Sequence, residues 1–154
     1  ELMALDSCGI TGIDHTLVGV RDLEVARAAW ARLGFTVTPR GRHIIRAKIG
    51  AGQPFNTVFV ERRPTGEVYS PELARNCPGR DWILTRILWL SGCDRGYNRM
   101  GHVDTMRRAI YIHGSPDTAD MGKPGSRGCV RMHNRDIVEL FDLVPVGTVV
   151  EIRE

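Results

Sequence analysis

Cysteine and aromatic residues are scarce in this chain, which has 4 cysteines among 154 residues and 6% aromatic residues. Four cysteines are too few for a disulfide-dense scaffold. The sequence contains no C-x-x-C pair, so we do not expect a structural zinc site. There is also no apolar run of about 18 residues, the length that a membrane-spanning helix needs. The longest candidate, residues 82–90, contains Arg86 and is typical of a buried strand.

The chain also has no large excess of charge of either sign. The formal net charge is +3, with 25% charged and 42% hydrophobic residues, which are ordinary values for a globular domain with a sizeable core. No cluster of Lys and Arg is interleaved with aromatic residues, so we do not expect a nucleic-acid partner. The mild positive charge is compatible with an anionic polymer but does not predict one.

One histidine and one cysteine stand out because of their surroundings. His113 ends the alternating apolar run I110-Y111-I112-H113, and Cys129 follows Gly128 in a glycine turn. A cysteine attacks carbonyl groups as the thiolate, and a nearby imidazole is the usual means of removing the thiol proton. The pair therefore indicates acyl transfer, the alternative being a buried thiol and a structural histidine.

The letters around this pair carry a family resemblance. The segment H113-G114, a polar Gly/Pro loop, and then S126-R127-G128-C129-V130-R131 resembles the catalytic signature of YkuD-type L,D-transpeptidases. The resemblance covers about Thr38 to Ile152 and includes T38-P39-R40-G41-R42-H43, R63-P64-T65-G66-E67 and the closing segment 143–152. It implies a mainly β fold, a YkuD-like β-sandwich with peripheral helices.

The resemblance also implies roles for individual residues. Cys129 would be the acylated nucleophile and His113 the general base. Gly128 and Cys129 would donate backbone N–H groups to the oxyanion, and Ser126 would shape the turn that directs these groups. A glycine before the nucleophile fits this role, because it adopts backbone angles that a side chain forbids and lets a carbonyl approach closely.

Three further residues are expected at the substrate. Arg131 matches the family's C-x-R arrangement and can bind a carboxylate through its planar fork, or else form an ion pair with Asp136. Gly114 is expected to line the substrate site. Arg127 stands where the family most often has a second histidine. It either favours the thiolate as a neighbouring cation or is a solvated loop charge.

The implied activity is cysteine-dependent L,D-transpeptidation. A peptidoglycan stem peptide would donate its diaminopimelate acyl group to Cys129, release the terminal D-Ala, and pass the acyl group to an amine or to water. No cofactor or metal is expected, and the periplasm or cell envelope is the expected location. The chain begins with Glu and shows no targeting sequence, which indicates a mature or excised segment or an export signal outside this sequence.

The first residues have a different character. Residues 13–38 predict a β-α-β unit that resembles the start of a glyoxalase-like domain of the vicinal oxygen chelate family, in which a histidine at the position of His15 ligates a metal. We expect 1–37 to be a glyoxalase-like segment without independent folding, and 38–154 to be the catalytic domain. The alternative functions are a metal-dependent glyoxalase-like protein and a catalytically impaired cell-envelope binding domain.

Periodicity predicts the remaining elements. Ile110 and Ile112 should face one side of their strand, and Tyr111 and His113 the other. Asn134 is expected to cap a helix, with His133 on the surface before it.

Cys77 and Cys93 could pair in an oxidising compartment, but buried or loop thiols are expected instead. The other expected elements are strands at 45–49, 57–62, 82–90 and 107–113, a helical turn at 70–76, and a last strand after the turn at 145–148.

Overall fold

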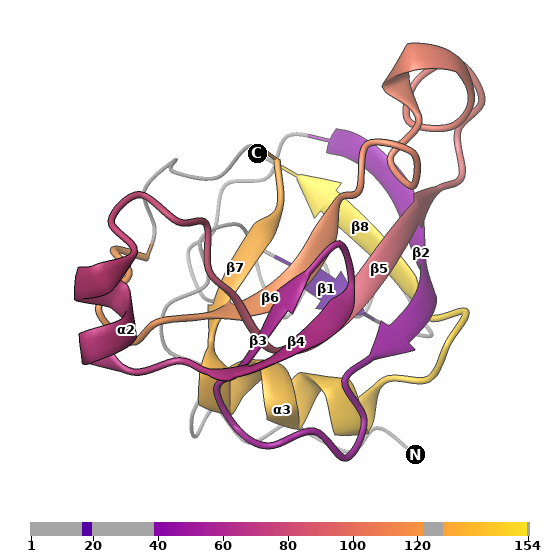
Figure 1. The fold of residues 1–154 in the computed structure, drawn as a ribbon. Coiled ribbons are helices and arrows are strands. Elements are labelled where there is room, and N and C mark those ends of the chain that lie inside the picture. Colours follow the sequence, from indigo (N-terminus) through magenta and orange to yellow (C-terminus); the bar gives the residue numbers. More distant parts are fainter. Residues whose placement is uncertain (1–16, 20–38, 122–127, 154) are drawn as a thin grey trace.

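The computed structural model describes residues 17–19, 39–121 and 128–153, and it is mainly β with few helices, as expected (Figure 1). The strands are β1 (Leu17–Gly19), β2 (Pro39–Ile49), β3 (Thr57–Val60), β4 (Arg63–Val68), β5 (Ile83–Gly92), β6 (Tyr111–Ser115), β7 (Val130–His133) and β8 (Val149–Arg153). The helices are α2 (Pro71–Asn76), the 3₁₀ turn η1 (Gly101–Val103) and α3 (Asn134–Leu143).

The eight strands form one connected sheet in which β5 is the central strand. The main path runs β1-β8-β2-β5-β3-β4, and β6 joins β5 and carries β7. All named strand pairs are antiparallel except β6 and β7, which run parallel. Parallel pairing brings the start of β7, which Cys129 directly precedes, beside the start of β6.

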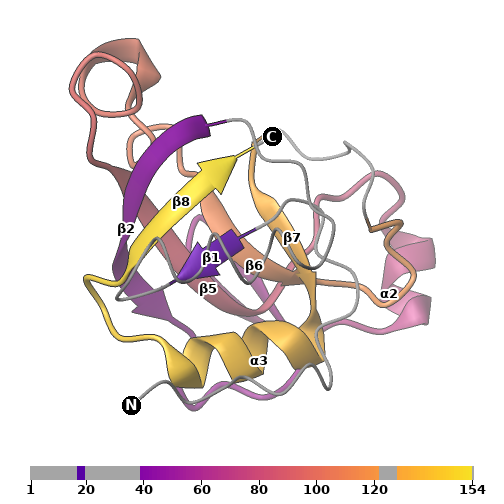
Figure 2. The ribbon, with the colours of Figure 1, turned by 180° about the vertical axis from the view of Figure 1, so that it is seen from behind.

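The main core fills the space between the sheet and α3. It combines buried side chains from β2, β5, β6, β7, β8 and α3, so the sheet must curl to bring strands that are distant in its order around one core (Figures 1 and 2). The helix contributes Ile137 and Phe141, one turn apart on its apolar face. The buried members are Ile45, Leu88, Leu90, Ile110, Ile112, Val130, Met132, Ile137, Phe141, Val144 and Val150.

A second, smaller cluster lies on the opposite face of the sheet. Phe59, Ile87 and Tyr111 form its buried part, and Trp89 and Cys129 are among the half-buried residues packed against it. Ile110 and Ile112 belong to the main core and Tyr111 to the second cluster, which confirms the predicted alternation along this strand. Ile110 and Ile112 thus pack into the core, and the opposite face of the strand carries Tyr111 and His113.

Three predicted details of the secondary structure are wrong. The strand expected at 57–62 ends at Val60, because residues 61 and 62 form the turn into β4. The strand expected at 107–113 begins only at Tyr111, because the carboxylate of Asp104 accepts the Arg107 backbone N–H and Ala109 has φ +56°. Asn134 does not cap α3, since His133 occupies the cap position without a side-chain hydrogen bond. The buried Asn134 amide bonds to Thr85 and Asn56 instead.

This buried amide explains the glycine next to His113. Thr85 donates to Asn134 Oδ1 at 2.6 Å, and Asn134 Nδ2 donates to Asn56 Oδ1 at 2.8 Å. A Cβ atom on Gly114 would collide with this Asn134 oxygen and with the Leu84 carbonyl. Packing of the backbone against these two groups therefore requires glycine at this position.

The N-terminal segment joins the sheet through β1, which pairs with β8 in the register Leu17 to Ile152. The predicted helix after it, His15 and Cys8 lie outside the described residues. Cys77 and Cys93 are free thiols, as expected. Neither described helix is long and apolar enough to cross a membrane.

Candidate active site

The pairing of β6 with β7 places the predicted nucleophile beside the predicted base. In this register Ile112 lies opposite Val130 and His113 lies opposite Arg131, so Cys129 is level with Tyr111. Alternation then puts Tyr111, His113, Cys129 and Arg131 on one face of the two strands. Strand spacing and rise place the Cα atoms of Cys129 and His113 roughly 8 Å apart, a separation that two facing side chains can bridge.

His113 is fixed in the state that a general base requires. Its side chain is only 2% exposed, and Nδ1 lies 2.8 Å from the Gly114 carbonyl oxygen. A carbonyl only accepts hydrogen bonds, so Nδ1 carries the proton and Nε2 keeps its lone pair. Burial lowers the pKa of His113, while the Gly114 hydrogen bond and the Asp81 charge oppose that shift. The ring is therefore neutral at pH 7.

Cys129 is held as a thiol in this resting site. It is half-buried, and Sγ donates to the Ala109 carbonyl at 3.5 Å. Burial raises the pKa of Cys129, the backbone of Tyr111 opposes this rise, and the Asp81 charge adds to it. The sequence predicted a proton transfer from Cys129 to His113 but not its timing, and burial of Cys129 favours the neutral thiol in the free protein.

Gly128 has the backbone conformation predicted for the residue before the nucleophile. Its φ is +123°, which side chains rarely adopt, and a Cβ atom there would lie 2.9 Å from Ile110 Cδ1. The oxyanion role of Gly128 and Cys129 stays a prediction. Ser126 and Arg127 lie outside the described residues, so the structure does not place them.

Arg131 lies opposite His113 on the same face and extends toward the loop after β6. Its Nη2 donates to the Asp120 carbonyl at 3.3 Å, and its charge contributes to the lowered pKa of His113. Gly114 is buried and packs against Asn134 and the Leu84 carbonyl. The carboxylate-binding role of Arg131 and the substrate contact of Gly114 both remain predictions.

Two charged residues near the site were not found from the sequence. Asp81 precedes β5 and acts electrostatically on both His113 and Cys129. Arg62 lies in the turn between β3 and β4, and its guanidinium donates to the Tyr111 hydroxyl at 2.6 Å. Both come from segments distant from the Cys129 loop in the sequence, and no local pattern connects them with it.

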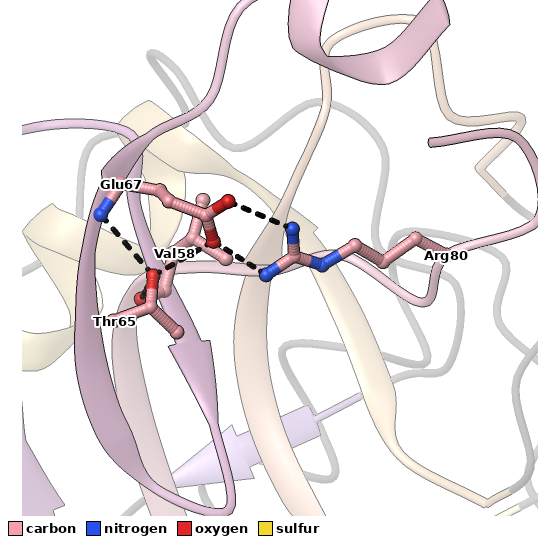
Figure 3. Close-up of polar contacts among 4 residues, drawn as sticks. All are labelled: Val58, Thr65, Glu67 and Arg80. Atoms are coloured by element: carbon pink, nitrogen blue, oxygen red, sulfur yellow. Dashed lines mark hydrogen bonds and ion pairs between the residues drawn. The ribbon is translucent and has the colours of Figure 1, made fainter. Parts of the chain in front are cut away.

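A salt bridge joins the segments that carry these two residues (Figure 3). Glu67 on β4 accepts from Arg80 at 2.6 and 3.1 Å, in the parallel two-bond arrangement that orients a guanidinium. Thr65 donates to Glu67 and to the Val58 carbonyl. Because both side chains are partly exposed to solvent, we assign the pair little stabilising energy. Its role is to connect the β3–β4 hairpin to the segment before β5.

His133 is less exposed than predicted. It is half-buried and lies opposite Ser115 at the end of β7. Together with Phe55, Asp117 and Arg135 it lines an open cavity of about 390 Å³. The described residues hold no cluster of three or more potential metal ligands.

Comparison with known proteins identifies the family of this chain. The family profile of the YkuD L,D-transpeptidase catalytic domain matches residues 13–152. YkuD of Bacillus subtilis, named as an L,D-transpeptidase, is 39% identical over 94 residues, which are 61% of this chain and 47% of the relative. ErfK/SrfK of Salmonella typhimurium, named as an L,D-transpeptidase, is 34% identical over 142 residues, 86% of this chain and 44% of the relative.

A third relative, YbiS of Escherichia coli, also named as an L,D-transpeptidase, is 35% identical over 123 residues, 73% of this chain and 39% of the relative. The chain thus spans less than half the length of these three relatives. No solved structure matches it significantly. The family match covers nearly the whole chain and includes both His113 and Cys129, so the chain belongs to the family of YkuD L,D-transpeptidase catalytic domains.

Proposed function

We propose that this chain is a cysteine-dependent L,D-transpeptidase that acts on peptidoglycan stem peptides in the cell envelope through an acyl-enzyme intermediate. In this proposal the YkuD-like β-sandwich catalytic domain takes in residues 13–37 as well as the residues from 38 onward expected from the sequence, because the family match begins at residue 13 and β1 pairs with β8 of the same sheet. Cys129 is the nucleophile and His113 the base. The family to which the chain belongs supports the choice of substrate.

The observation that carries the proposal is the position and state of His113. It shares a sheet face with Cys129 on neighbouring parallel strands, and its Nδ1–H is donated to the Gly114 carbonyl. The basic Nε2 is therefore available for a thiol proton. A nucleophile, a neighbouring base and a third group that orients the base are the three parts that nucleophilic catalysis requires.

Acylation then follows from these groups. Cys129 Sγ bonds to the carbonyl carbon of the donor residue as its proton passes to His113 Nε2. The Gly128 and Cys129 N–H groups would stabilise the resulting oxyanion. When the tetrahedral intermediate collapses, the C–N bond breaks and His113 returns the proton to the departing amine. The product is a thioester on Cys129 and a free terminal D-amino acid.

Deacylation uses the same groups in reverse. An acceptor amine gives a proton to His113, attacks the thioester carbonyl and releases the Cys129 thiol. Water in the same position would give hydrolysis, which is carboxypeptidase activity. We propose an amine as the acceptor, on the basis of the family alone.

Mass spectrometry tests the proposal directly. Incubation with a synthetic tetrapeptide donor should release the terminal D-Ala and leave a transient acyl mass on the peptide that contains Cys129. Adding a D-amino acid as acceptor should remove the adduct and yield the exchanged peptide. Release of D-Ala without any adduct, or an adduct confined to another residue, would contradict the proposed intermediate.

The pH dependence of thiol alkylation provides a further prediction. Burial raises the pKa of Cys129, so alkylation by iodoacetamide should increase only above the ordinary thiol range of about 8.5. Because burial lowers the pKa of His113, the ring should remain neutral as the pH falls through about 6.5, and acyl transfer should persist there. Peptide mapping separates Cys129 from Cys77 and Cys93, which serve as internal references.

The Asp81→Asn variant tests the sign of this effect. It removes a negative charge that raises the pKa of Cys129, so its alkylation profile should move to lower pH. Full alkylation of wild-type Cys129 near pH 6 would instead show a resting thiolate paired with a protonated His113. Slow alkylation at every pH combined with no acyl transfer would favour the impaired binding domain.

A further inference from the structure

An arginine of the β3–β4 hairpin lies over the active-site face, and the proposed mechanism does not use it. Glu61 and Arg62 form the two-residue turn between Val60 and Arg63, which are paired across the hairpin. Both turn residues have positive φ, +47° and +69°, as a tight hairpin turn requires. These side chains rarely adopt such angles, so the hairpin holds Arg62 in a costly conformation.

The guanidinium of Arg62 is fixed on two aromatic rings. Its central carbon lies 4.5 Å from the centre of the Trp89 ring and 5.9 Å from that of Tyr111. Arg62 also donates a hydrogen bond to the Tyr111 hydroxyl at 2.6 Å. The two rings stack edge to face at 6.2 Å. Stacking and one hydrogen bond therefore orient the guanidinium without neutralising its charge.

These rings are also the neighbours of the nucleophile. Tyr111 is level with Cys129 in the parallel register, and Trp89, Tyr111 and Cys129 belong to the same cluster. Arg62 therefore contacts the ring that is level with the thiol, whereas Arg131 is level with His113, two positions further along the strands. A peptide bound at Cys129 would thus have a cation near Tyr111 and another near His113.

Most of the hydrogen-bonding capacity of Arg62 remains unused. A guanidinium has five N–H donors, and the Tyr111 hydroxyl is the one acceptor that Arg62 meets among the described residues. The Trp89 indole N–H beneath it is buried and also has no acceptor among those residues. The simple alternative is that Arg62 serves only to satisfy the buried Tyr111 hydroxyl.

We infer that Arg62 binds a carboxylate of the donor peptide close to the scissile bond. A half-buried, oriented guanidinium, most of whose donors meet no acceptor among the described residues, matches a carboxylate in charge and in geometry. The inference rests on the proposed function for the identity of the peptide. Two carboxylates of the donor have this chemistry, namely the terminal carboxylate of the departing D-Ala and the free carboxylate of the diaminopimelate residue.

Binding of inert complexes tests this role separately from catalysis. In the Cys129→Ala background, calorimetry would measure the dissociation constants of three tetrapeptides: the unmodified donor, its C-terminal carboxamide, and its diaminopimelate carboxamide. Each is compared in proteins carrying Arg62, Arg62→Gln or Arg63→Gln. Gln retains a donor for the Tyr111 hydroxyl. Arg63 is the matched control, since it is the exposed next residue of the same hairpin.

Arg62→Gln should weaken binding of the unmodified donor about 10- to 100-fold, the loss expected for a hydrogen-bonded charge pair. The effect should vanish for the carboxamide that removes the bound carboxylate, which identifies its source, and Arg63→Gln should bind all three peptides normally. An equal loss for all three peptides, or none for any, would overturn the inference and leave Arg62 a structural role. Failure of the proposed function would appear separately, as no release of D-Ala by the protein with Cys129 intact.

Discussion

Replacement of Cys129 by alanine should abolish acyl transfer and the acyl adduct while the protein stays folded. The thiol is the only group in the proposed step that bonds to the substrate, so no other side chain can replace it. Serine should fail as well, because a neutral imidazole activates a hydroxyl far less readily than a thiol. The loss should exceed the sensitivity of a D-Ala release assay, and intact-mass spectra should show no adduct.

The fold should tolerate this change. Cys129 is half-buried at the edge of the second cluster, so its truncation should cost about 1 kcal/mol of the free energy of unfolding. Cys77→Ala is the matched control, because Cys77 is a half-buried thiol that follows α2. It should retain full activity. A Cys129→Ala protein that still forms the adduct would assign the nucleophile to another residue.

Much of the sheet could be predicted because its strands carry their burial pattern in the sequence. Residues 82–90 are almost uninterrupted in apolar character, and β5 is indeed the central strand, with neighbours on both edges. Alternation along 110–113 separated the core face from the face of His113 correctly. Local periodicity indicates which face of a strand is buried. It was therefore sufficient to predict that His113 points away from the main core.

Long-range contacts could not be predicted in the same way. Asn134 looks like a helix cap, yet its amide bonds to Thr85, 49 residues away. Thr85 has φ +68° at an irregularity in β5, which the propensities of a β-branched residue do not suggest. Likewise, Arg62 and Asp81 reach the site only because the hairpin and the segment before β5 fold toward it. Tertiary contacts override local signals at these positions.

The protonation state of Cys129 in the free protein also could not be predicted from the sequence. The spacing of His113 and Cys129 suggested a proton transfer, but not whether it has already happened in the free protein. Burial of both groups decides this question, since desolvation favours the neutral form of an imidazole and of a thiol alike. Burial accordingly lowers the pKa of His113 and raises that of Cys129, so both groups favour their neutral forms in the free protein.

Replacement of His113 by asparagine should reduce acylation about 10²- to 10⁴-fold, the contribution of a positioned general base. The asparagine amide can still donate to the Gly114 carbonyl that now accepts from Nδ1, so the variant removes the base and keeps its anchor. His113 is 2% exposed, and truncation to alanine would also leave a cavity and an unsatisfied carbonyl. The rate of adduct formation, corrected for the folded fraction, is the measurement that separates catalysis from stability.

A second buried histidine provides the control for this prediction. His43 on β2 is 4% exposed, contacts Thr105 and the Gly41 carbonyl, and has a pKa lowered by burial, as His113 does. His43→Asn loses the bond to Thr105 and should lower the melting temperature, but each folded molecule should acylate at the normal rate. If His113→Asn behaved in the same way, with normal activity in the surviving fraction, His113 would be a structural residue and the base would have to be another group facing Cys129.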